Sequence, residues 1–113
     1  MFKVLVSDPI ADKGISTLED AGLEVVYNPN PTDDELQNLV RDAHAWVVRS
    51  GTQITADLLK DARNLQVIGR AGVGVDNIDI LEATNRGVVV MNIPDGNTVS
   101  AAEHTMALMT ALA

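Results

Sequence analysis

Residues 65–79 read LQVIGRAGVGVDNID, and this segment combines a short apolar run, a cation and a glycine-rich turn. The run VIG is too short for a helix and predicts a buried strand. Arg70 follows the run, and Gly72-Val73-Gly74 then leads towards a helix start at Asp76 or Asn77. A strand, a glycine turn and a helix in this order are typical of one unit of an α/β fold.

The same alternation extends in both directions from this segment. Four further apolar runs predict strands, at residues 3–7, 25–27, 46–48 and 88–91. Helices are predicted at residues 12–21, 55–62 and 79–86, and from Thr32, which forms a capping box with Glu35. The order βαβαβαβαβ predicts right-handed crossovers and a flavodoxin-like, doubly wound parallel sheet of five strands. Its strand order is 2-1-3-4-5 and its architecture is three-layer α/β/α.

Composition limits the classes of protein to which the chain can belong. Its 113 residues suit one compact domain, and 46% of them are hydrophobic. There is no cysteine, which excludes disulfides and thiolate metal sites and fits a cytoplasmic location. The apolar run at the start is too short for a signal peptide or a membrane span. The net charge of −8 argues against non-specific binding of nucleic acid.

Ligands of open parallel sheets bind at the carboxyl ends of the strands, and two predicted loops there carry an arginine followed by glycine. Arg49 and Ser50 follow the third strand, and Arg70 and Gly72-Val73-Gly74 follow the fourth. Glycine lets backbone N–H groups approach a ligand, and arginine suits carboxylate or phosphate. We therefore consider a small-anion site. The alternative is that the arginines only pair with carboxylates, of which Asp8, Asp76 and Asp79 lie within reach in sequence.

Other kinds of site find little support. A dinucleotide fingerprint would need a third glycine at Asn77, so that interpretation fails. His44 and His104 are expected to be structural or exposed, and no metal-binding or catalytic triad spacing is present. The segment after Asn97 predicts a helix to the end of the chain, with a capping box at Ser100 and an apolar surface almost all round. A helix with such a surface is normally buried on several sides.

Three segments resemble the D-isomer-specific 2-hydroxyacid dehydrogenase family. They are VRSGT at residues 48–52, LQVIGRAGVGVDNID at residues 65–79, and GVVVMNIPDGNTVSAAEH at residues 87–104. Within the family, the likeness is greatest to members that use NAD to oxidise 3-phosphoglycerate to 3-phosphohydroxypyruvate in serine biosynthesis. The resemblance covers essentially the whole chain.

The resemblance implies a two-lobed enzyme, of which residues 1–97 form the substrate-binding lobe and residues 98–113 begin the interdomain helix. The nucleotide-binding lobe, with its NAD turn and catalytic residues, would then be absent, so the chain would be truncated and inactive alone. It would bind no cofactor or metal itself. By the resemblance, substrate contacts fall on Arg49, Ser50, Arg70, Gly72, Val73, Gly74 and Asn97. The terminal helix could join two copies in a homodimer.

Three alternatives remain open at this level. The parent enzyme could act on another 2-hydroxyacid, as glyoxylate or lactate-type members do. A phospho-accepting receiver shares the fold, but Arg49 stands where its aspartate would be required. A non-catalytic interaction module is the third alternative.

Overall fold

A computed structural model describes residues 2–9, 12–49, 51–71 and 77–93 of the chain. Strands and helices alternate along it. The strands are β1 (Lys3–Val6), β2 (Glu24–Tyr27), β3 (Ala45–Val48), β4 (Val67–Ala71) and β5 (Val89–Ile93). The helices are α1 (Asp12–Asp20), α2 (Asp33–Val40), α3 (Ala56–Asp61) and α4 (Ile80–Asn85).

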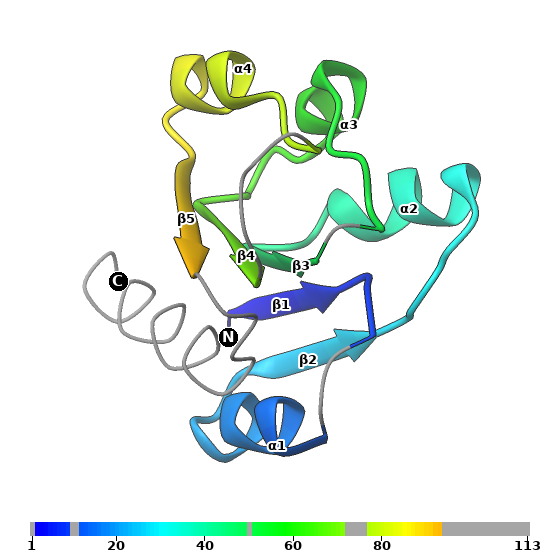
Figure 1. Cartoon of the computed structure of the whole chain (residues 1–113), viewed down its shortest axis with the longest axis vertical. Coiled ribbons are helices and arrows are strands. Elements are labelled where there is room, and N and C mark those ends of the chain that lie inside the picture. Colours follow the sequence, from blue (N-terminus) through cyan, green and yellow to red (C-terminus); the bar gives the residue numbers. More distant parts are fainter. Residues whose placement is uncertain (1, 10–11, 50, 72–76, 94–113) are drawn as a thin grey trace.

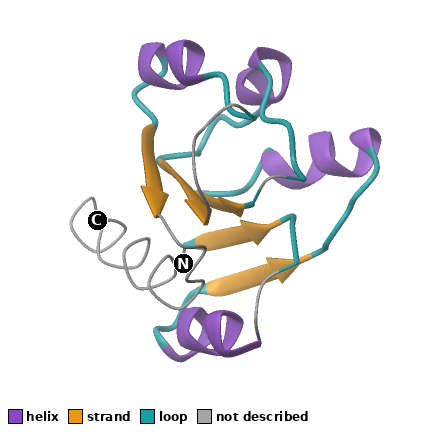
Figure 2. Ribbon diagram, viewed as in Figure 1, coloured by secondary structure: helices purple, strands orange, loops and turns teal. Residues whose placement is uncertain are grey.

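The five strands form one parallel sheet in the order β2-β1-β3-β4-β5, which confirms the predicted fold (Figure 1). Helix α1 lies on one face of the sheet, and α2, α3 and α4 lie on the other (Figure 2). Because all strand pairs are parallel, the carboxyl ends of the strands lie at one edge of the sheet, where ligands of such sheets bind.

Two strands extend further than the sequence predicts. Arg70 was expected in the loop after the fourth strand, but it lies inside β4, where it pairs with Val48 of β3 and Asn92 of β5. Asn92, expected in the loop after the fifth strand, lies inside β5, where it pairs with Arg70 of β4. Pairing with neighbours on both sides carries β4 past the point where its apolar run stops.

The predicted helix boundaries hold to within a residue or two. Thr32 and Glu35 form the expected capping box of α2, and Thr55 caps α3. Gly22 lies in the turn after α1 with a φ of 86°, a conformation that suits glycine. The expectation that a helix starts at Asp76 or Asn77 is wrong for Asn77, because α4 begins at Ile80 with Asp79 as its cap.

The core consists of two layers, one on each face of the sheet. On the α1 face, Leu18 packs with alternate strand residues, which are Val4, Val6, Ala45, Val47 and Val67. On the other face, the larger layer is built around Trp46, Leu5, Val48 and Ile68, which α2, α3 and α4 cover. Both layers follow from the alternation of side chains along a strand. In the described part of the chain, no helix is both long enough and apolar enough to cross a membrane.

Candidate functional site

The two arginines singled out in the sequence come to the same edge of the sheet. Val48, the last residue of β3, pairs with Arg70 in β4, and Arg49 follows Val48 directly. The backbone positions of the two arginines are therefore close neighbours on adjacent strands. Arg49 is exposed, whereas Arg70 is 6% exposed.

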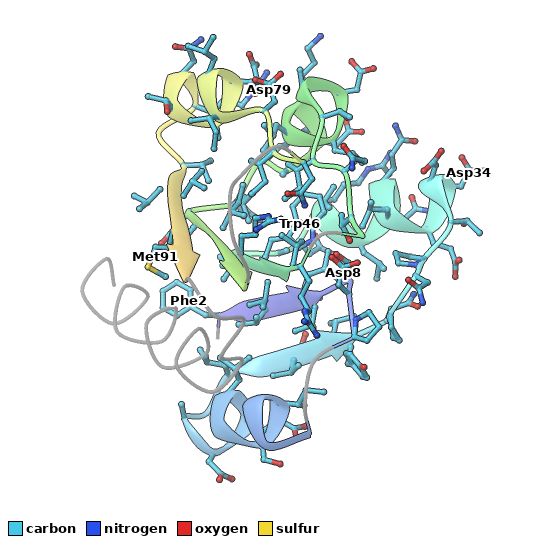
Figure 3. All side chains as sticks on the ribbon, viewed as in Figure 1. Phe2, Asp8, Asp34, Trp46, Asp79 and Met91 are labelled. Carbon is cyan, nitrogen blue, oxygen red and sulfur yellow. The ribbon has the colours of Figure 1, made fainter. Side chains whose placement is uncertain are left out.

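Asp8, which follows β1, holds the loop after β3 in place. One of its carboxylate oxygens, Oδ2, accepts the backbone N–H of Arg49 at 2.7 Å and that of Thr52 at 3.0 Å. The other, Oδ1, accepts the hydroxyl of Thr52 at 2.8 Å. Figure 3 shows Asp8 at the carboxyl end of β1, beside Trp46. Asp8 is 2% exposed, so these bonds compensate the burial of its carboxylate.

A chain of hydrogen bonds links this carboxylate to the core. The indole Nε1–H of Trp46 donates to the Ser7 hydroxyl at 2.8 Å, and that hydroxyl lies 2.8 Å from the hydroxyl of Thr52. Because a carboxylate can only accept, Thr52 donates to Asp8 and therefore accepts from Ser7. Every donor in the chain points towards Asp8, an arrangement in which successive bonds polarise one another.

Asn77 connects the loop after β3 to the loop after β4. Its side-chain Nδ2 donates to the carbonyl oxygens of Arg49 and Thr52, both at 2.7 Å. Its Oδ1 accepts the Nε–H of Arg70 at 2.6 Å. Asn77 is itself 6% exposed, and next to it Ile78 forms a parallel bridge with Ile54. The amide group thus has bonds to both arginine-bearing segments.

Hollows in the surface occur at the carboxyl ends of the strands and also at their amino ends. A hollow of about 260 Å³ at the carboxyl edge is lined by Asp8, Pro9, Asn30, Arg49 and Gly51. A larger one, about 440 Å³, lies at the amino ends of β3 and β4 and is lined by Arg41, Asp42, Asp61, Arg63 and Asn64. The first is the relevant one because it lies where ligands of parallel sheets bind.

The sequence left open that nearby carboxylates pair with the arginine side chains. For Asp8 the observed bond is to the arginine backbone instead. Asp8 binds the backbone N–H of Arg49, and no ion pair or hydrogen bond joins the Arg49 guanidinium to any residue that the structure describes. Asp79 accepts the N–H of Glu82 as the cap of α4. Asp76, the third candidate partner, lies outside the described residues.

Several residues singled out in the sequence lie outside the residues that the structure describes. They are Ser50, Gly72, Val73, Gly74, Asn97 and, with the predicted terminal helix, His104. His44 has a structural contact, since its Nδ1 accepts the backbone N–H of Lys3 at 3.0 Å. Its ring also packs edge-on against Phe2. Among the residues described, no group of three or more acidic or histidine side chains is placed to hold a metal ion.

Residues 4–113 match the sequence profile of the D-isomer specific 2-hydroxyacid dehydrogenase catalytic domain. The chain belongs to this family. It is homologous to the substrate-binding domain of D-3-phosphoglycerate dehydrogenases. It is 50% identical over 113 residues to that enzyme from Methanocaldococcus jannaschii, of which it spans 21% of the length.

Solved structures support the same assignment. The TT0316 protein of Thermus thermophilus superposes on 99% of the chain with a TM-score of 0.78 and 32% identity, and 37% of that protein is covered. The NAD⁺-bound 3-phosphoglycerate dehydrogenase of Entamoeba histolytica covers 80% of the chain with a TM-score of 0.72 and 32% identity. The chain spans 32% of it. Membership in this dehydrogenase family removes the receiver alternative.

Sequence reasoning missed three residues of the site. It placed Asp8 at the correct edge without its role, took Asn77 for a helix start, and gave Thr52 no function. The available signal was local: a carboxylate, a hydroxyl and an amide follow three strands of one parallel sheet, so they must meet at one edge. Which of them would bond to backbone groups depends on loop geometry, which the sequence does not specify.

Proposed function

We propose that this chain binds the carboxylate and phosphate of 3-phosphoglycerate for an NAD-dependent D-3-phosphoglycerate dehydrogenase. The observation that carries the proposal is that Arg49, directly after β3, and Arg70, inside the adjacent β4, have neighbouring backbone positions at the carboxyl edge of a chain with a net charge of −8. Two cations at neighbouring positions of an acidic protein suit a small anion with two charged groups.

The identity to D-3-phosphoglycerate dehydrogenases supports this substrate over other 2-hydroxyacids. By the family resemblance, Val73 and Gly74 offer backbone N–H groups to the substrate carboxylate. The same resemblance would place Arg49, Ser50 and Arg70 near the phosphate and Asn97 at the hinge between the lobes. A parent that acts on a glyoxylate or lactate-type substrate remains the second candidate, because such substrates share the carboxylate and lack only the phosphate.

The chain's own residues do not fit NAD. The sequence contains no G-x-G-x-x-G turn, which the pyrophosphate of a dinucleotide requires. We therefore assign NAD and hydride transfer to the rest of the parent enzyme, and residues 1–97 to substrate binding. A cytoplasmic location and pairing of two copies through residues 98–113 complete the proposal.

Titration of the ¹⁵N-labelled chain with 3-phosphoglycerate tests the binding proposal. The expected result is shifted amide signals at Arg49, Arg70 and the 72–74 loop, with a dissociation constant on the order of 1 mM, about 4 kcal/mol. The affinity is expected to be weak because closure of the second lobe normally completes such a site. Shifts confined to other surfaces would contradict the proposal.

Matched arginine variants sharpen this test. Arg49→Gln should weaken binding, whereas Arg63→Gln should not, because Arg63 lies by the amino end of β4, at the opposite edge of the sheet. Both variants remove one positive charge, so net charge alone cannot explain a difference. D-glycerate, which lacks the phosphate, should bind more weakly than 3-phosphoglycerate. Equal binding of the two ligands would favour the second candidate substrate class.

The chain alone is expected to show no dehydrogenase activity, because neither the dinucleotide turn nor an acid–base pair is present in the proposed site. The assay follows NADH absorbance with the purified chain, NAD⁺ and excess 3-phosphoglycerate. Turnover above a protein-free blank would show that catalytic groups lie within these 113 residues.

A further inference from the structure

In the loop after β3, the backbone at Arg49 and at Thr52 is held by two side chains from other parts of the chain. Asp8 binds the N–H groups of Arg49 and Thr52. Asn77 binds the carbonyl oxygens of the same two residues. The peptide groups at the two ends of this turn are therefore fixed by one anionic acceptor and one amide donor.

The two side chains differ in what else they touch. Apart from this loop, Asp8 belongs to the hydroxyl chain that leads to the core. Asn77 instead accepts the guanidinium Nε–H of Arg70 at 2.6 Å. One buried amide thus bonds to the guanidinium of Arg70 and to the backbone carbonyl of Arg49.

We propose that Asn77 is a positioning residue that fixes the Arg70 guanidinium relative to the backbone of Arg49 and so favours substrates with two anionic groups over monocarboxylates. The inference rests on the proposed function, because it assigns both arginines to one ligand. A ligand with two anionic groups benefits only when both cations are held at a matching separation, whereas a monocarboxylate needs a single cation.

The chemistry of the amide explains why asparagine suits this position. Its Nδ2 offers two N–H donors, which the two carbonyl oxygens use, and its Oδ1 offers an acceptor to the arginine. An aspartate would repel both carbonyls, and a leucine could neither donate nor accept. Because Asn77 is buried, water cannot readily replace these bonds.

The test compares two ligands on three forms of the chain: unaltered, Asn77→Ala and Leu18→Ala. The measured quantity is the ratio of the dissociation constants for D-glycerate and 3-phosphoglycerate, from chemical-shift titrations. The ratio should be about ten in the unaltered chain, corresponding to one additional charge-assisted bond. In Asn77→Ala the ratio should fall towards one.

Leu18→Ala separates positioning from general loss of stability. Leu18 is fully buried in the core layer on the face of the sheet that α1 covers, and its truncation lowers stability without removing any bond of Asn77. Its ligand ratio should equal that of the unaltered chain. An unchanged ratio in Asn77→Ala, or an equal fall in Leu18→Ala, would overturn the inference.

A measurement on the unaltered chain keeps the inference testable if Asn77→Ala does not fold. The side-chain NH₂ signals of Asn77 and the Nε–H signal of Arg70 should shift together during titration with 3-phosphoglycerate, and less with D-glycerate. If the arginine signals move while the amide signals stay fixed, Asn77 does not couple them and the inference fails. If the unaltered chain binds neither ligand, the proposed function itself fails, which is a different result.

Discussion

Gly51 lies so close to the Asp8 carboxylate that a side chain at this position would collide with it. A Cβ atom at Gly51 would lie 2.8 Å from Oδ1 of Asp8, below the distance that carbon and oxygen tolerate. The carboxylate is the end of a short side chain, but three hydrogen bonds to Arg49 and Thr52 hold it. It cannot move aside without losing at least one of them.

We therefore predict that Gly51→Ala destabilises the chain by about 1–3 kcal/mol and weakens binding at the Arg49 loop. Urea unfolding measures the first effect and 3-phosphoglycerate titration the second. Gly22→Ala is the matched control. At Gly22 no atom lies within 4 Å of the added Cβ, and the cost comes from its φ of 86° alone. Gly22→Ala should lower stability and leave binding intact. Intact binding in Gly51→Ala would contradict the predicted contact.

The residue scale is also where prediction from the sequence reaches its limit. The edge of the sheet at which Arg49 and Asp8 meet follows from strand order, and this was predicted. The bonds of Asp8 and Asn77 to the backbone of the loop after β3 join positions far apart in the chain. Such bonds depend on how the loop folds to a fraction of an ångström, and no local propensity encodes that.

At the scale of elements, the start of α2 shows how closely local sequence determines local structure. Thr32 and Glu35 satisfy each other's backbone N–H groups, at 3.0 Å from Thr32 N to Glu35 Oε1 and 3.2 Å from Glu35 N to Thr32 Oγ1. The bond from the Thr32 backbone, and then that from its side chain, lowers the pKa of Glu35 from its ordinary value. Both partners lie within one helical turn, so this feature could be predicted from spacing alone.

This lowered pKa predicts a pH-dependent contribution to the stability of α2. Because the pKa is lower in the folded state, the contribution is present above the unfolded value of about 4.3 and is lost as the pH falls through the folded-state pKa. Glu35→Gln can keep the hydrogen bond but does not titrate. The difference in unfolding free energy between the unaltered chain and Glu35→Gln should therefore shift against the unaltered chain on going from about pH 7 to about pH 3. A difference that is constant with pH would contradict the assignment.

Strand ends were less predictable than helix caps. A run of β-branched residues marks the interior of β4, but its end is set by the partners on either side. Arg70 stays in the strand because Val48 and Asn92 continue the pairing. Charge and glycine content suggested a loop there, and tertiary pairing prevailed.

At the scale of the whole molecule, the two core layers are unequal. Among the described elements, three helices cover one face of the sheet and α1 covers the other. Leu18 of α1 is fully buried in the smaller layer. Phe2 and Met91, both labelled in Figure 3, are partly buried and pack against this smaller layer. The alternation of apolar residues predicted which strand residues face each layer, but not how much each helix would cover.

We predict that Leu18→Ala lowers the unfolding free energy by about 2–5 kcal/mol, because it leaves a cavity under α1. The loss should concentrate in that layer, so amide exchange in α1 should accelerate more than exchange in α3, which packs on the opposite face. Hydrogen exchange followed by NMR measures both helices at once. Equal acceleration in the two helices would mean that the layers unfold as one unit.

The strand order has a consequence for the time at which the sheet can form. β1 lies between β2 and β3, and its pairing with β3 joins Val4 to Ala45. A ribosome must therefore release everything up to β3 before the first strand has both neighbours. Until then β1 can pair on one side only, and the segment that must fold back to bring β3 beside it contains α1, β2 and α2. Closing such loops costs entropy before any contact repays it, which places parallel sheets among the slower folds. The first strand to be synthesised therefore keeps one unpaired edge until β3 has been released, and during that interval this edge can pair with other chains.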